Sequence, residues 1–274
     1  MQAYRDRSPV GLNHDELALE ERESVSRALN RIRPSIVINC AAFHNVDACE
    51  AQPERAFLVN AIAVDQLAAA CEAVGARLAT ISTDYVFDGA SKHPYDVDDE
   101  CFPTNVYGIS KRAGELLLAR RGGHVVFRTS GLYGRPGTTS TTKGYTFVDR
   151  VLARAERGEP LRIVTDVISS PSYAPDVADT IKSALDKRAA GVYHVTNSGE
   201  CSWYDFATAA VRQANLPVTV AAILSTEFAS RVRRPLYSAL SSASIERLGV
   251  SPLPHWRDAL ARYVESRAER KRSA

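Results

Sequence analysis

A tyrosine and a lysine four residues apart are the side chains of this sequence best suited to chemistry. Tyr107 and Lys111 stand in YGISK, followed by RAGELLLARR, a run rich in good helix formers. Both side chains are therefore expected on one helical face, one turn apart. A tyrosine with an ordinary pKa near ~10 is a poor acid or base at neutral pH, but a neighbouring ammonium group stabilises its phenolate. We predict that Lys111 lowers the pKa of Tyr107 and that Tyr107 transfers a proton to or from a carbonyl or alcohol oxygen.

Two polar residues upstream are expected to lie beside this pair. Thr83 and Asp84 follow the apolar run ARLATIS, which is typical of a buried parallel strand. In open α/β sheets, ligands bind outside the carboxyl ends of the strands. The sequence therefore predicts that Thr83 meets the tyrosine and the lysine at one edge of a sheet.

The composition is that of an ordinary globular protein. Of the 274 residues, 45% are apolar and 24% are charged, and the net charge is +2. This charge gives no electrostatic case for nucleic-acid binding. Apolar runs such as IVINCAA fall far short of the roughly 20 residues that span a bilayer, and the polar start MQAYRDRSPVGLNHDE does not resemble a signal peptide. The sequence therefore predicts no membrane partner.

The five cysteines are scattered, without the spacing of a zinc or redox site. We interpret them as reduced thiols of a cytoplasmic protein and expect Cys40 and Cys71 in the core.

Strand and helix patterns alternate along the first half of the chain. SIVIN, ARLATIS and HVVFRTS are typical of buried strands, and helical stretches separate them. This alternation predicts an α/β fold with a doubly wound parallel sheet. We expect a dinucleotide-binding, Rossmann-like domain over residues 1–145. Residues 146–274 are expected to form mainly a smaller substrate-binding region, with some segments returning to the sheet.

Several sequence blocks resemble those of the extended short-chain dehydrogenase/reductases, and within them the dTDP-4-dehydrorhamnose reductases. The blocks include STDYVFDG, NVYGISK, SSPSYAPDVAD, GVYHVTNSGECSWYDFA and RRPLYSAL. The resemblance implies reduction of the C4 keto group of dTDP-4-dehydro-L-rhamnose with NADPH or NADH. It also implies a nucleotide-sugar substrate and allows a homodimer. Magnesium is suggested by the family resemblance only, and we assign no cluster of carboxylates in the sequence to a metal.

The resemblance also assigns site residues. The catalytic set is Thr83, Tyr107 and Lys111, in which Tyr107 protonates the developing alkoxide, Lys111 holds the nicotinamide ribose and Thr83 hydrogen-bonds the carbonyl oxygen. The cofactor contacts are Ala18, Leu19, Ala42, Phe43 and His44, together with Tyr107 and Lys111. The substrate contacts are Thr83, Asp84, Gly131 and Arg234. Arg234 lies in an RRP segment whose two guanidinium groups suit a diphosphate, although a solvated basic turn is an equal interpretation.

The sequence departs from the family pattern at four positions of the expected site. Gly131 replaces a tryptophan that packs on the sugar, and Thr146 replaces an asparagine. Ala18 stands where an aspartate is usual, and His44 replaces a threonine. These differences leave the exact nucleotide sugar and the adenine contacts open.

The start of the sequence departs further. The resemblance places Met1 near the end of the family's first helix, so about 20 residues of a βαβ unit are expected to be absent, including the first strand and the glycine-rich turn. A mis-assigned start, a true loss and a binding-only protein each explain this, and the other retained blocks favour the first. GLYGRPG has the spacing GxxGxxG but lacks a following helix, and we interpret it as a loop.

Two further functions stay open. The first is a non-catalytic sugar-nucleotide-binding or regulatory subunit of the same fold, such as the regulatory subunit of methionine adenosyltransferase. The second is an epimerase or dehydratase of another nucleotide sugar.

Overall fold

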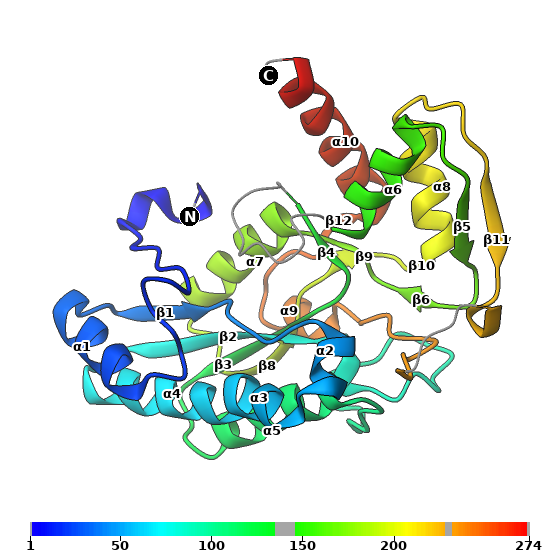
Figure 1. The fold of residues 1–274 in the computed structure, drawn as a ribbon. Helices are drawn as coiled ribbons and strands as arrows, with labels where there is room; N and C mark the ends of the chain where they lie inside the picture. The colour runs from blue at the N-terminus through cyan, green and yellow to red at the C-terminus, as the bar shows by residue number, and fades with distance from the viewer. Residues whose placement is uncertain (1, 135–145, 228–231, 273–274) are drawn as a thin grey trace.

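A parallel sheet of four strands forms the centre of the protein. The computed structural model describes residues 2–134, 146–227 and 232–272. In these parts the sheet has the order β1-β2-β3-β8, and all of its strand pairs are parallel (Figure 1). Its strands are β1 (Ile36–Asn39), β2 (Arg77–Thr83), β3 (Val125–Thr129) and β8 (Gly191–His194). The strands expected from SIVIN, ARLATIS and HVVFRTS are therefore confirmed.

Helices cover both faces of this sheet. On one face, Leu78 and Val126 pack with α1 (Arg22–Ile32), α4 (Ala63–Ala73) and α5 (Val106–Ala119). On the other, Ala79 and Phe127 pack with α7 (Ala174–Asp186) and α9 (Ala243–Arg247). Because successive side chains of a strand point to opposite faces, both faces of these strands are apolar. The doubly wound α/β fold predicted from the sequence is confirmed.

The connection between β1 and β2 is mostly helical. It contains α2 (Val46–Ala51), α3 (Pro53–Phe57), a π-helical turn at Leu58–Ile62, and α4. By length and composition alone, residues 53–73 could cross a membrane, and their mean hydropathy is 1.4. The short apolar runs of the sequence did not predict this. Half of this stretch is buried inside the protein. Packing against the sheet therefore accounts for its apolar character.

The C-terminal part builds a separate helical lobe beside the sheet (Figure 1). Its helices α6 (Phe147–Glu156), α8 (Trp203–Gln213) and α10 (Trp256–Arg272) pack around an aromatic core. The predicted N-cap Ser202 is confirmed, because its hydroxyl accepts a hydrogen bond from the Asp205 amide at 2.9 Å. Three segments beyond residue 146, α7, β8 and α9, return to the central sheet.

Four short strand pairs lie outside the central sheet in the described residues. The pairs are β4 (Leu132–Tyr133) with β7 (Ser172–Tyr173), β5 (Leu161–Val164) with β11 (Val220–Ile223), β6 (Ile168–Ser169) with β10 (Cys201–Ser202), and β9 (Asn197–Ser198) with β12 (Leu253–His255). A kinked 3₁₀ segment lies at Gln2–Arg7, and single 3₁₀ turns lie at Asp84–Val86 and Ser225–Glu227. The GLYGRPG segment, interpreted as a loop, begins with strand β4, and its last three residues lie outside the described part.

Of the two cysteines expected in the core, only one is there. Cys71 is buried on the inner face of α4, whereas Cys40 is exposed just after β1. A residue that follows the end of a strand emerges at the sheet edge, where little covers it, so the expectation for Cys40 was wrong.

A buried ion pair ties α5 to the sheet. Arg128 of β3 donates to both carboxylate oxygens of Glu115 of α5, at 3.0 and 2.8 Å, and both side chains are almost fully buried. Ser82 of β2 donates to the same carboxylate at 2.5 Å. Burial raises the pKa of Glu115, but the hydrogen bonds and charge of Arg128 more than offset it and hold the pKa below its usual range. The network therefore joins β2, β3 and α5 at one point.

Replacing Arg128 by methionine should destabilise the protein strongly. The variant leaves the Glu115 carboxylate buried without its main partner, and breaking such a pair costs about 3–5 kcal/mol. Urea denaturation at neutral pH measures the loss. Because the folded-state pKa of Glu115 is lowered, its stabilisation is full above the unfolded pKa and disappears as the pH falls through the folded pKa. Arg154→Met is the control, since its pair with Glu159 is exposed and should cost less than about 1 kcal/mol. Equal losses in both variants would contradict the prediction.

Candidate active site

The carboxyl end of β2 and the first turn of α5 bring the predicted catalytic residues together. Asn105 caps α5 by accepting a hydrogen bond from the Gly108 amide at 2.9 Å. An added Cβ on Gly108 would lie 2.1 Å from the Tyr85 carbonyl oxygen, so only glycine allows α5 to approach the 3₁₀ turn after β2 this closely. This contact places Tyr107 beside Thr83.

Tyr107 and Thr83 are joined by a hydrogen bond between their side chains. The same Thr83 hydroxyl donates to Asp84 Oδ1 at 3.0 Å. Burial raises the pKa of Tyr107, and the hydrogen bond with Thr83 opposes this only in part. Tyr107 is therefore protonated at neutral pH.

Lys111 lies one turn further along α5 and is buried. Its ammonium group donates to the Ile81 carbonyl of β2 at 2.7 Å. Burial lowers the pKa of Lys111 to about 8, against the opposing negative charge of Glu115. The pKa of Tyr107 is thus raised in this structure and not lowered as predicted, because removal from water outweighs the other influences on the phenol. The effect of Lys111 on this pKa stays a prediction.

Asp84 is the buried anchor of the site. Its Oδ2 accepts hydrogen bonds from Ser130 at 2.7 Å and Ser238 at 2.6 Å, in addition to the Thr83 bond. Burial raises the pKa of this carboxyl group, and the three hydroxyl donors oppose the shift. Asp84 thereby fixes Thr83 and ties β2 to two distant loops.

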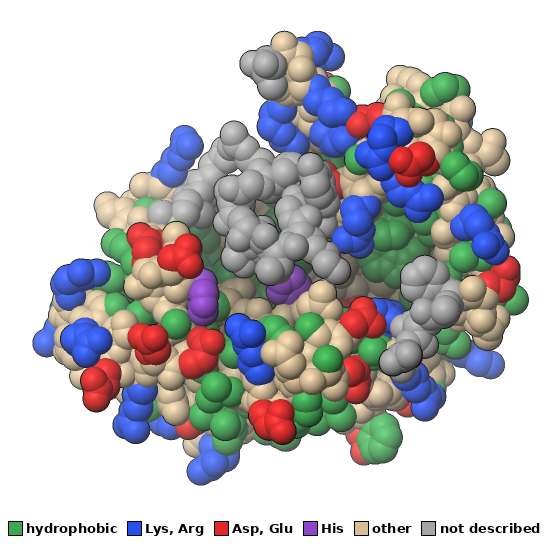
Figure 2. Space-filling model, viewed as in Figure 1, with side chains coloured by type: hydrophobic (Ala, Val, Ile, Leu, Met, Phe, Trp, Pro, Cys, Tyr) green, Lys and Arg blue, Asp and Glu red, His purple; other side chains and the backbone are tan. Residues whose placement is uncertain are grey.

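A cavity of about 170 Å³ opens onto these groups. Its lining includes four predicted residues, Thr83, Asp84, Tyr107 and Gly131, and these meet residues of the C-terminal part. The space-filling view shows this face hollowed between the sheet and the C-terminal lobe, with hydrophobic side chains on the lobe side (Figure 2). The structure therefore gathers the predicted catalytic tyrosine and the sugar contacts into one pocket.

Arg234 lies next to this pocket. It pairs with Asp47 at 3.0 Å and hydrogen-bonds the Tyr85 phenol, and its neighbour Pro235 lines the cavity. Arg233 is exposed, and its backbone carbonyl accepts a hydrogen bond from Asn105. The RRP segment is thus attached to the cap of the catalytic helix.

The predicted cofactor residues after β1 form a braced loop. Asn60, buried in the π-helical turn, accepts from the Phe43 amide at 2.9 Å and donates to the Phe43 carbonyl at 3.0 Å. Its amide group also donates to Ser110 of α5 at 3.0 Å. A π-helical turn of this kind often marks a functional site. Ala42 is half-buried beside it and His44 is exposed, so this loop is fixed to the helix that carries Lys111.

Ala18 and Leu19 lie elsewhere, in the segment before α1. Leu19 packs in the core with Val25 and Leu29, and Ala18 is half-buried. Neither lines the catalytic pocket, and their role at the adenine stays a prediction.

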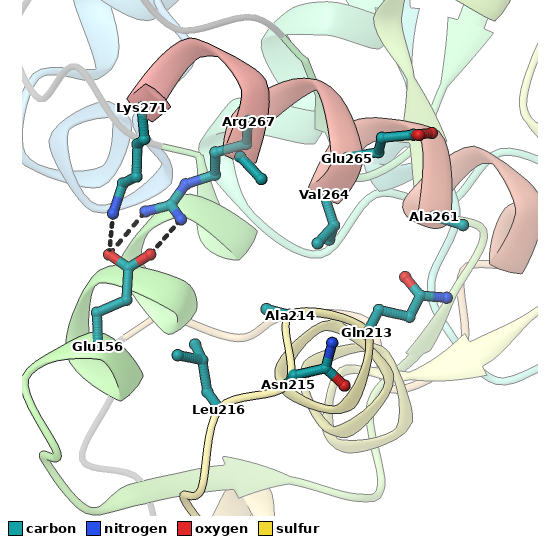
Figure 3. Close-up of a pocket in the computed structure, with 11 residues that line it drawn as sticks. Glu156, Gln213, Ala214, Asn215, Leu216, Ala261, Val264, Glu265, Arg267 and Lys271 are labelled. Atoms are coloured by element: carbon teal, nitrogen blue, oxygen red, sulfur yellow. Dashed lines mark hydrogen bonds and ion pairs between the residues drawn. The ribbon is translucent and has the colours of Figure 1, made fainter. Parts of the chain in front are cut away.

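A larger cavity, of about 460 Å³, lies between α6, α8 and α10, away from these groups (Figure 3). Several charged side chains of this cavity form ion pairs with each other. Glu156 pairs with Arg267 at 2.5 Å and with Lys271 at 2.6 Å. Over the described ranges, no group of three or more His, Cys, Asp or Glu side chains is arranged to hold a metal ion.

The fold and this site define a class. A doubly wound parallel sheet that presents Thr83 at a strand end, opposite Tyr107 and Lys111 on the next helix, is the arrangement of a short-chain dehydrogenase/reductase. Residues 2–269 match the family described as RmlD substrate binding domain, and the chain belongs to this family.

Named relatives agree with this assignment. The chain is 38% identical over 260 residues to the spore coat polysaccharide biosynthesis protein SpsK of Bacillus subtilis, covering 94% of this chain and 89% of that protein. It is 36% identical to a dTDP-4-dehydrorhamnose reductase of Burkholderia thailandensis, covering 92% and 88%. A crystal structure of dTDP-4-dehydrorhamnose reductase from Bacillus anthracis in complex with NADP superposes with a TM-score of 0.90 at 32% identity, covering 97% and 94%. The chain is thus an enzyme of the oxidoreductase class.

Sequence reasoning missed part of the pocket. Val167, Ser169 and Trp203 line it, and Ser130 and Ser238 hold Asp84. These residues come from segments far apart in the sequence, and no local spacing connects them. Ser169, Trp203 and Ser238 lie in the blocks SSPSYAPDVAD, ECSWYDFA and RRPLYSAL, which resemble the family, but the resemblance gave these three residues no role.

Replacing Lys111 by methionine should stabilise the protein. The folded-state pKa of about 8 lies below the ordinary value of 10.5, so burying the charged lysine costs up to about 3 kcal/mol below pH 8. Between these two pKa values the unfolded chain binds more protons than the folded protein, and the cost shrinks as the pH rises. Thermal unfolding at pH 7 and pH 10 measures this. We expect the variant to be the more stable at pH 7, with a smaller advantage at pH 10. A variant that is less stable at pH 7 would refute the assignment of Lys111 as a buried charge.

Proposed function

We propose that this enzyme reduces the C4 keto group of dTDP-4-dehydro-L-rhamnose with a nicotinamide cofactor. The observation that carries the proposal is the convergence of Thr83 and Tyr107 on one pocket, with Lys111 buried one turn behind them on α5.

The proton chemistry follows from the protonation states. Reduction of a ketone adds a hydride to carbon and a proton to oxygen. Tyr107 is protonated, so its O–H bond breaks as the proton passes to the developing C4 alkoxide. Thr83 lies beside the phenol, and turning its hydroxyl from Asp84 Oδ1 toward the substrate would let it donate a hydrogen bond to the same oxygen. The phenolate left behind is stabilised by the nearby ammonium group of Lys111.

The residues beside Lys111 fit the nicotinamide half of the cofactor, which when bound supplies the hydride. Small side chains, Cys40, Ala41 and Ala42, follow β1 and leave the backbone open to a flat ring, and Asn39 holds the turn by accepting from the Ala41 amide at 3.0 Å. Lys111 is buried within electrostatic range of Cys40 and is placed to donate to ribose hydroxyls. Phe43 and His44 continue this loop, and Ala18 and Leu19 are assigned to the adenine end. The NADP in the related crystal structure supports NADPH, with NADH the alternative.

The identity of the sugar rests on the named relatives. The Burkholderia relative supports dTDP-4-dehydrorhamnose, whereas SpsK is named only for spore coat polysaccharide biosynthesis. The pocket supplies Asp84 and Gly131 to the sugar, and Arg234 at its rim is positioned for the diphosphate. A cytoplasmic location and a homodimer are proposed from the same resemblance, as is the division at residues 145 and 146.

The alternatives make different predictions. A non-catalytic binding subunit would bind nucleotide sugar without oxidising NADPH. An epimerase would return its cofactor unchanged, and the likeness to UDP-glucose 4-epimerase of Thermotoga maritima, at 20% identity, shows the fold alone.

Replacing Tyr107 by phenylalanine should lower kcat by about 10²- to 10⁴-fold, because the proton donor is lost. The measurement is NADPH oxidation at 340 nm with dTDP-4-dehydro-L-rhamnose, alongside NADPH affinity by nicotinamide fluorescence, which should change little. Tyr193→Phe is the matched control, because Tyr193 packs against Phe127 on the sheet, outside the pocket lining. Unchanged turnover in the Tyr107 variant would sink the mechanism, and cofactor binding without any turnover by the wild type would favour the binding subunit.

A further inference from the structure

One wall of the catalytic pocket is not used by the proposed chemistry. Opposite Thr83, Asp84 and Tyr107, the cavity is lined by Val167, Ser169 and Trp203, which we call the lobe wall. All three come from the C-terminal part of the chain. Building on the proposed function, we propose that the lobe wall recognises the sugar ring, with Ser169 binding a sugar hydroxyl and Trp203 covering an apolar face of the ring.

Ser169 has a buried hydroxyl without a partner. The side chain is 3% exposed, and no group in the described part of the structure hydrogen-bonds its Oγ. Leaving a buried polar group unsatisfied is unfavourable, and native structures keep few such groups. The neighbouring serines differ, since Ser238 donates to Asp84 and Ser170 accepts from the Leu240 amide at 3.3 Å. A ligand hydroxyl in the cavity would satisfy Ser169.

Trp203 supplies the apolar part of the wall. It is the first residue of α8, and its ring is half-buried and packs on Phe147 at 4.5 Å between centroids. An added Cβ on Gly131 would lie 3.2 Å from Cη2 of this ring and 3.3 Å from Pro171. Gly131 also has a φ of +51°, which disfavours other residues. The glycine therefore leaves the space that the tryptophan ring occupies at the pocket.

The backbone holds the two side chains in register. β6 pairs with β10, so that Ser169 lies opposite Cys201 and Ile168 opposite Ser202. The Trp203 amide donates to the Val167 carbonyl at 3.2 Å. The hydroxyl and the ring thus form one preorganised surface, which suits a sugar because its hydroxyls and its C–H faces alternate.

The position of the lobe wall in the pocket determines which part of the substrate it contacts. Tyr107 and Thr83 take the reacting oxygen on the other side, so Ser169 is left for another hydroxyl of the ring. The nucleotide lies outside this wall in our assignment, toward Arg234. The wall should therefore distinguish sugars and leave nucleotide affinity unchanged.

The test compares binding of dTDP-L-rhamnose and of dTDP alone to the full chain by calorimetry, with NADP⁺ present. Ser169→Ala should weaken dTDP-L-rhamnose about 3- to 10-fold and leave dTDP unchanged. Ser170→Ala is the matched control: it removes a buried hydroxyl that does not line the cavity, and should lower thermal stability without altering either affinity. Equal affinity of wild type and Ser169→Ala for dTDP-L-rhamnose would overturn the role of Ser169.

Tryptophan fluorescence tests the ring separately. The chain has two tryptophans, and the other, Trp256, is only 1% exposed in the core of the lobe. Saturating dTDP-L-rhamnose should change the emission of the wild type, and Trp203→Phe should abolish that change. An unchanged emission at saturation overturns the role of Trp203. If the wild type binds dTDP but not dTDP-L-rhamnose, both the proposed substrate and this inference fail. If the wild type binds both ligands and the variants show no effect, only the inference fails.

Discussion

The buried carboxylate of Glu115 is the constraint on which the site depends. It accepts hydrogen bonds from Ser82 of β2, Arg128 of β3 and Arg112 of α5, so two strands and the catalytic helix meet at one charge. A buried ion pair contributes little net stability, because desolvation offsets its attraction, but it is costly to break. Here it fixes the height of α5 relative to the ends of the strands. Tyr107 lies on α5, and Thr83 directly follows Ser82. The Glu115 contact therefore sets the distance between Tyr107 and Thr83.

Asp84 joins the two sides of the pocket through its hydrogen bonds, as Glu115 joins the sheet to α5. Its carboxyl group accepts hydrogen bonds from Thr83 of β2, from Ser130, which follows the neighbouring strand β3, and from Ser238 of the C-terminal part. Because an unpaired buried carboxylate is strongly unfavourable, these bonds hold the Ser238 segment against the ends of the two strands. This side of the pocket is thereby assembled by folding, ahead of any ligand.

The sequence predicted those features of the fold that depend on local residue patterns. The strands, the catalytic helix and its face bearing Tyr107 and Lys111 follow from apolar runs and helical spacing, and the structure bears them out. Ser169 and Trp203 could not be found in this way, because their meeting with Tyr107 is set by the packing of the lobe on the sheet. The position of Cys40 and the pKa of Tyr107 were misjudged for a related reason, since both depend on how much protein covers a group.

That misjudgement bears on the direction of the reaction. A lowered tyrosine pKa would supply phenolate, the form that removes a proton from an alcohol during oxidation. Burial instead raises the pKa of Tyr107, so the neutral phenol prevails, and an alkoxide is far more basic than a phenolate and still takes its proton. Lys111, with its pKa of about 8, is charged at neutral pH, and in the proposed mechanism its charge favours the phenolate that forms. The neutral phenol of Tyr107 is the form that the proposed reduction requires as its proton donor.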